Sequence, residues 1–157
     1  MTSKVTYLGD LRTKSIHVQS GSEIISDAPL DNNGKGEAFS PTDTVANALA
    51  SCMFTIMGIK ARDMNVNIND STAEVTKIMN AEPRRIGAIE IVFEMKGASD
   101  EKDKTILERA AMTCPVFLSL NSDIEKRITF NWKLSYNLYL RTIRKLMVFL
   151  CPNFNFD

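Results

Sequence analysis

The chain has 157 residues, of which 44% are hydrophobic and 24% charged, and its 19 Lys and Arg balance its 19 Asp and Glu. These values are typical of one globular domain with a sizeable core, and the balanced charge argues against a nucleic acid as partner. We recognise no signal peptide and no apolar run of membrane-spanning length, so we expect a cytoplasmic protein without a membrane span. Three widely spaced cysteines and a single histidine argue against a disulfide scaffold and against a metal site.

The first forty residues are predicted to form three strands and a loop. Short runs of alternating apolar and polar residues, separated by glycine-containing turns, indicate strands at residues 4–8, 12–20 and 22–28. Residues 29–40 are rich in Gly, Asn and Asp and show no periodicity, which is typical of a loop.

A long helix is predicted from Pro41 onwards. Ser40 is a candidate cap, proline is well suited to the first helical position, and Asp43 suits the positive end of the helix dipole. Apolar residues then recur at three- and four-residue steps, at Val45, Leu49, Cys52, Ile56 and Ile59. A thiol therefore lies within the apolar stripe, where it is either core filler or a reacting group.

The second half is predicted to contain a β-hairpin at residues 71–96, a helix at 99–113, a short helix from Pro115 and a strand at 127–132. This order indicates an α+β domain over residues 1–133, with an antiparallel sheet and helices on one face. Residues 134–157 differ in composition and are assigned to a separate C-terminal extension. It is either an amphipathic helix that could lie on a membrane surface, an extension packed on its own domain or on a partner subunit, or an irregular terminus.

A second thiol, Cys114, directly precedes Pro115 at the start of the predicted short helix. Unpaired N–H groups and the positive end of the dipole at this place would lower its pKa and favour the thiolate. On this reasoning alone Cys114 is the preferred nucleophile, and Cys52 is its candidate partner.

Three segments carry a resemblance to a known family: "YLGDLRTKSIHVQSG", "FSPTDTVANALASCMFTIMGIKARDM" and "ILERAAMTCPVFLSL". Together they resemble the OsmC/Ohr family of thiol-dependent peroxidases, over roughly Lys4 to Trp132. The specific features are a proline-started helix with its cysteine three turns in, and a Cys-Pro-Val start to a short helix before the last strand. In the well-studied peroxidase branches a glutamate follows the proline, where this chain has Thr42, so the resemblance is to the OsmC-like branch.

The resemblance implies an OsmC-like fold with antiparallel sheets, a long central helix that carries a cysteine, and an intertwined homodimer with two active sites near its interface. Cys52 would attack the terminal oxygen of an organic hydroperoxide or of hydrogen peroxide, and Cys114 would resolve the sulfenic acid as a disulfide. An external thiol, dithiol or lipoyl-type reductant would complete the cycle, with no metal or other cofactor.

The family also implies an arginine and an acid that hold the thiolate and orient the peroxide. Arg12, in the early strands, is the candidate arginine, and Asp43, at the start of the long helix, is the candidate acid. Glu37, in the loop before the helix, is a candidate to replace Asp43 in space.

Two other interpretations stay open. The chain could be a non-catalytic dimer that binds a small apolar molecule in the same pocket, or a thiol sensor whose oxidation involves Cys151. If they face Cys52, four apolar residues would give the pocket a wall that favours organic hydroperoxides; these are Met53, Phe54, Met57 and Met64.

Overall fold

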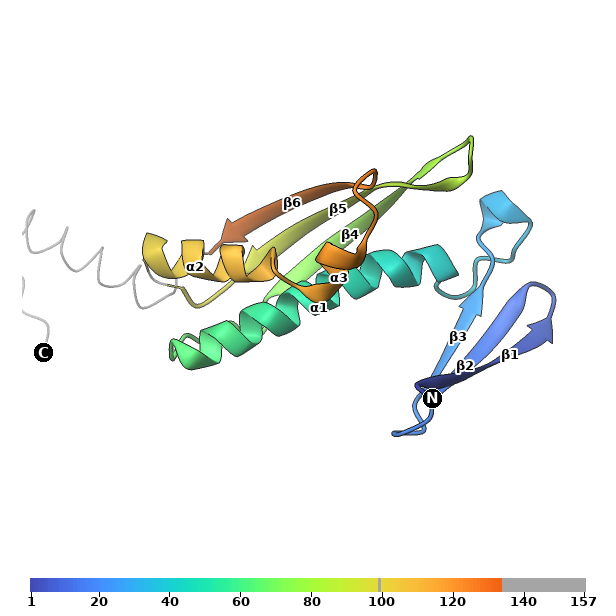
Figure 1. Ribbon diagram of the computed structural model, residues 1–157, viewed down its shortest axis with the longest axis horizontal. Helices are drawn as coiled ribbons and strands as arrows, with labels where there is room; N and C mark the ends of the chain where they lie inside the picture. Colours follow the sequence, from blue (N-terminus) through green and yellow to red (C-terminus); the bar gives the residue numbers. More distant parts are fainter. Residues whose placement is uncertain (99, 134–157) are drawn as a thin grey trace, which may run out of the picture.

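The computed structural model describes residues 1–98 and 100–133, which form two three-stranded sheets and a group of helices (Figure 1). The predicted C-terminal extension, with the sensor role suggested for Cys151, lies outside the described residues. The predicted α+β class is confirmed, and the predicted strands and helices all appear within a few residues of their expected positions.

The N-terminal sheet is an antiparallel meander of β1 (Ser3–Gly9), β2 (Arg12–His17) and β3 (Glu23–Asp27). In Figure 1 it stands beyond the N-terminal end of the long helix. The strand register places three exposed apolar side chains, Val5, Tyr7 and Ile24, on one face of this sheet. Small sheets need a covered apolar face for stability, so this face is suited to a partner.

The long helix α1 (Pro41–Asp63) follows a short 3₁₀ turn, η1 (Leu30–Asn32), within the predicted loop. It begins where predicted, because Ser40 and Asp43 form a capping box. The Ser40 Oγ accepts a hydrogen bond from the Asp43 backbone N–H at 3.1 Å, and the Asp43 Oδ2 accepts one from the Ser40 backbone N–H at 2.8 Å.

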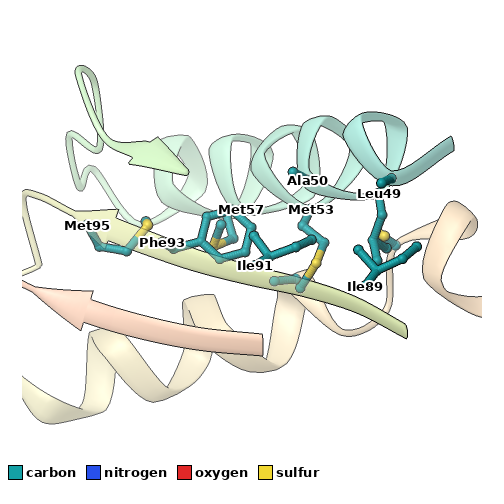
Figure 2. Packing of buried hydrophobic residues seen from close by; sticks show 11 residues of the cluster. Leu49, Ala50, Met53, Met57, Ile89, Ile91, Phe93 and Met95 are labelled. Atoms are coloured by element: carbon teal, nitrogen blue, oxygen red, sulfur yellow. The ribbon is translucent and has the colours of Figure 1, made fainter. Parts of the chain in front are cut away.

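The main core lies between α1 and the second sheet, which contains β4 (Thr72–Asn80) and β5 (Arg85–Met95). Figure 2 shows side chains of α1 packed against those of β5. The alternation predicted for β5 is confirmed, since its apolar side chains are fully buried: Ile89, Ile91, Phe93 and Met95. On α1 the buried set includes Leu49, Met53 and Met57, whereas Val45 and Ile59 are exposed. The buried face of α1 is therefore rotated about the helix axis relative to the predicted stripe. The reason is that the sequence of a helix that is apolar on several sides does not indicate which side enters the core.

The remaining elements are α2 (Glu101–Ala111), α3 (Pro115–Ser119) and β6 (Glu125–Trp132). Both helices pack against α1, and β6 lies beside β5 as the third strand. The β5–β6 pair is parallel, so the prediction of a purely antiparallel sheet was wrong here. The reason is that α2 and α3 form a crossover that returns the chain to the same end of the sheet.

Helix α1 is long and apolar enough to cross a membrane, by length and composition only. This is weak evidence, because core helices of globular proteins meet the same criteria. In this chain one side of α1 packs on β5, as the core cluster shows.

Candidate functional site

The two thiols that lie 62 positions apart in the sequence meet where α3 packs against α1. Cys52 is half-buried near the middle of α1, and Cys114 is fully buried at the N-cap of α3. Both are free cysteines in the same hydrophobic cluster, and Cys52 is close enough to Cys114 to act on its pKa. The fold therefore brings together the two residues that the sequence singled out.

Burial raises the pKa of the Cys114 thiol, and the neighbouring Cys52 raises it further. The backbone N–H of Phe117 donates a hydrogen bond to the Cys114 Sγ at 3.3 Å and acts in the opposite direction, but burial outweighs it. The expectation that the helix start lowers the pKa of Cys114 was therefore wrong in its net sign. A thiol that stays protonated is a poor first nucleophile, because only the thiolate attacks.

Arg12, on β2, forms ion pairs with two carboxylates. Its Nη2 donates a hydrogen bond to the Asp27 Oδ2 at 3.0 Å and another to the Glu37 Oε2. The bonds to Glu37 and Asp27 raise the pKa of the guanidinium, so Arg12 stays charged. Glu37, the suggested substitute, is thus a direct partner of Arg12. Asp27 was missed by sequence reasoning, and the only local signal was its place opposite Arg12 in the β2–β3 register.

Asp43 is placed differently from the expectation that it orients the arginine. Its Oδ1 pairs with the Lys77 Nζ at 2.7 Å, and Lys77 also donates a hydrogen bond to the Thr42 Oγ1 at 2.9 Å. Burial opposes the charge of Asp43, but hydrogen bonds from Lys77 and Ser40 keep its pKa below the usual value. In this chain Asp43 fixes the start of α1 and ties it to β4.

An open cavity of about 460 Å³ lies beside the start of α1. Its lining combines charged and apolar side chains, among them Glu37, Phe39, Asp43, Val75 and Lys77. The cavity therefore adjoins the carboxylate that pairs with Arg12.

Within one chain, neither Arg12 nor Asp43 is brought to the thiols. Among the residues that the structure describes, the hydrogen bonds and ion pairs of Arg12 and Asp43 reach neither sulfur. Cys52 lies about 16 Å along the helix axis from Pro41, at a rise of about 1.5 Å per residue. The thiol pair and the arginine cluster are therefore two separate sites in the single chain.

The expected apolar wall beside Cys52 is mainly core. Met53 and Met57 are fully buried against β5 (Figure 2), and the Phe54 ring packs edge-on against Phe93 with centroids 4.8 Å apart. These side chains belong to the hydrophobic cluster that also contains both thiols, and they do not line the cavity beside the start of α1.

Comparisons with known proteins identify the family and the fold. Residues 34–129 match the family model described as OsmC-like protein. The crystal structure of a protein from Psychrobacter arcticus 273-4, described as an osmotic stress induced and detoxification response protein, is 55% identical, with a TM-score of 0.81 over 83% of this chain and 96% of that one. A comparison with curated proteins gives no match.

More distant structures share the fold. The organic hydroperoxide resistance protein OhrB of Bacillus subtilis is 16% identical, with a TM-score of 0.58 over 83% of this chain and 98% of that one. An organic hydroperoxide resistance protein OsmC from Legionella pneumophila is 15% identical, with a TM-score of 0.60 over 83% and 97% of the two chains. The family model covers more than half of the chain and the Psychrobacter protein matches most of it, so this chain belongs to the OsmC-like protein family.

Proposed function

We propose that the protein is a thiol-dependent peroxidase that reduces organic hydroperoxides, with Cys52 as the attacking thiol and Cys114 as the resolving thiol. The observation that carries the proposal is the pair of free thiols that meet at the contact of α1 and α3. The raised pKa of Cys114 supports this order, because a thiol that stays protonated does not compete with Cys52 as the first nucleophile. Membership of a family that includes organic hydroperoxide resistance proteins supports the substrate class.

The proposed reaction balances without a metal or flavin. The Cys52 thiolate attacks the terminal peroxide oxygen, the O–O bond breaks, and the alkoxide leaves and takes a proton to become the alcohol. Cys114 then attacks the Cys52 sulfur, the S–O bond breaks, and hydroxide leaves with the Cys114 proton as water. An external dithiol, for example a dihydrolipoyl group, attacks the resulting disulfide to give a mixed disulfide; its second thiol then releases both protein thiols and the reductant leaves as the cyclic disulfide. Such a cycle is suited to the cytoplasm, where thiols are kept reduced.

The proposed active form is a homodimer in which a second copy supplies the arginine. The uncovered face of the N-terminal sheet, with Val5, Tyr7 and Ile24, supports a partner subunit, as do the exposed Val45 and Ile59 on α1. A partner seated there can bring its Arg12 to the Cys52 of the first chain, where a guanidinium would stabilise the thiolate and the developing negative charge on the peroxide.

The test is thiol titration with intact-mass analysis before and after one equivalent of cumene hydroperoxide. The wild type should lose two thiols and the mass of two hydrogens, and Cys114→Ser should accumulate a sulfenic acid at Cys52. Cys52→Ser should keep its thiols, and Cys151→Ser is the matched control that should behave as the wild type does. Light scattering on the same samples should give the mass of a dimer.

If the wild type and both variants keep their thiols over minutes, the peroxidase proposal fails and the pair is core packing in a binding scaffold. If Cys151→Ser alone abolishes disulfide formation, the sensor interpretation replaces it.

A further inference from the structure

The carboxylate of Asp27 is a buried charge in a sheet whose other residues are all partly or fully exposed. Its side chain has 0% exposure, against 30% for Arg12 and 60% for Glu37. The Asp27 Oδ2 accepts a hydrogen bond from the Arg12 Nη2 and another from the Glu37 backbone N–H, each at 3.0 Å. A buried carboxylate is tolerated only when it is paired and hydrogen-bonded, so the charge of Asp27 depends on both of these contacts.

The two carboxylates hold Arg12 in different ways. Asp27 is opposite Arg12 in the β2–β3 register, and its own backbone N–H donates a hydrogen bond to the Phe39 carbonyl at 3.2 Å. Its position is therefore fixed by strand and loop together. The Glu37 side chain is mainly in water, where an ion pair is weak and readily exchanged.

We propose that Asp27 is a positioning residue that retains the Arg12 guanidinium while Glu37 is exchanged for the thiolate or the peroxide. This inference rests on the proposed function. The Asp27 Oδ1 has no hydrogen-bond partner among the described residues, so it can accept a second N–H of Arg12 when Glu37 leaves. The pair would then become bidentate, the geometry that fixes a guanidinium best. Arg12 thus exchanges Glu37 for the thiolate or the peroxide while it stays paired with Asp27.

The first test observes Arg12 directly and needs no peroxidase activity. In wild-type protein labelled with ¹⁵N-arginine, NMR should detect slow rotation of one guanidinium, assigned to Arg12 by its loss in Arg12→Ala. Asp27→Asn keeps the shape of the side chain and removes its charge, and it should abolish the slow rotation. Glu37→Gln should preserve it. Glu23→Gln is the matched control, because Glu23 lies on the same strand and forms an ion pair with Lys14, whose side chain is 34% exposed.

The second test measures how Asp27 acts on the reaction, with the rate of Cys52 oxidation by cumene hydroperoxide. Asp27→Asn should lower the second-order rate constant by about tenfold or more, as expected for a lost hydrogen bond between charged groups. In an Arg12→Ala background the same substitution should change it by less than about twofold, because the effect passes through Arg12. Glu23→Gln should react as the wild type does.

Slow rotation that survives Asp27→Asn would overturn the inference, and so would an equal rate loss in both backgrounds. A folding defect is recognised by the melting temperature of each variant and by the dispersion of its NMR spectrum. If wild-type Cys52 does not react at all, the proposed function fails. The guanidinium signals then decide by themselves whether Asp27 holds Arg12.

Discussion

The start of α1 offers a sharp energetic test, because a single buried hydroxyl organises it. Ser40 is 1% exposed, and its Oγ accepts the Asp43 backbone N–H at 3.1 Å and the Lys77 Nζ at 3.3 Å. Ser40→Ala removes both bonds and also the contact of 3.1 Å between the Ser40 Oγ and the Thr42 Oγ1. Loss of a helix N-cap costs about 0.5–2 kcal/mol, and burial excludes water as a replacement, so we expect the upper end, about 2 kcal/mol.

For a chain of this size, that loss lowers Tm by about 4–8 °C. The assay is thermal and urea unfolding followed by circular dichroism, with all variants at one protein concentration because a dimer makes Tm depend on concentration. The control is Thr44→Ala: among the described residues its hydroxyl donates one hydrogen bond, to the Ser40 carbonyl within the same turn, and its loss should cost less than about 0.5 kcal/mol. Equal costs for the two substitutions would refute the assignment of Ser40 as the organising cap.

Two further outcomes follow from the charges. Since burial raises the pKa of Cys114, the rate of disulfide formation after Cys52 oxidation should keep rising with pH past 9.0. Stopped-flow measurement of a single turnover gives this rate. A plateau below about pH 8 would contradict the raised pKa. For Asp43, whose pKa is lowered, Asp43→Asn should destabilise the protein above pH 3.8. This difference from the wild type should shrink at lower pH, where wild-type Asp43 is protonated as well; a gap in Tm that persists in acid would argue against the Lys77 ion pair as its origin.

Most of the fold could be predicted because its signals are local. The Ser40-Pro41 start of α1 depends on residues that are adjacent in sequence, and the alternation of Ile89, Ile91 and Phe93 marks one buried face of a strand. The parallel pairing of β6 was missed, because the sequence of a single strand does not contain the direction of its neighbour. Which side of α1 enters the core was also missed, since Val45 is as apolar as the buried Leu49.

For the candidate site, the sequence identified the thiols, the arginine and Glu37 as a candidate acid, but neither Asp27 nor the burial of Cys114. Asp27 ends an ordinary alternating strand, and its burial depends on Arg12 and Glu37, which are distant in the chain. Likewise, the effect of the helix start on the pKa of Cys114 is local and was correctly identified. The opposing effect, burial of the thiol, depends on tertiary packing and is the larger of the two. Where a local and a tertiary effect act on one pKa in opposite directions, the sign of the net shift can be read only from the three-dimensional structure.

The contact between α1 and α3 also has a consequence for the chain as a polymer. A bond between Cys52 and Cys114 would close a loop of about 60 residues, which restricts the unfolded ensemble and stabilises the folded state by about 4 kcal/mol in the chain-entropy model. This loop contains β4, β5 and α2, which include most of the second sheet. The oxidised protein would then resist heat and proteolysis better than the reduced one, so its lifetime in a cell would increase with its exposure to oxidant.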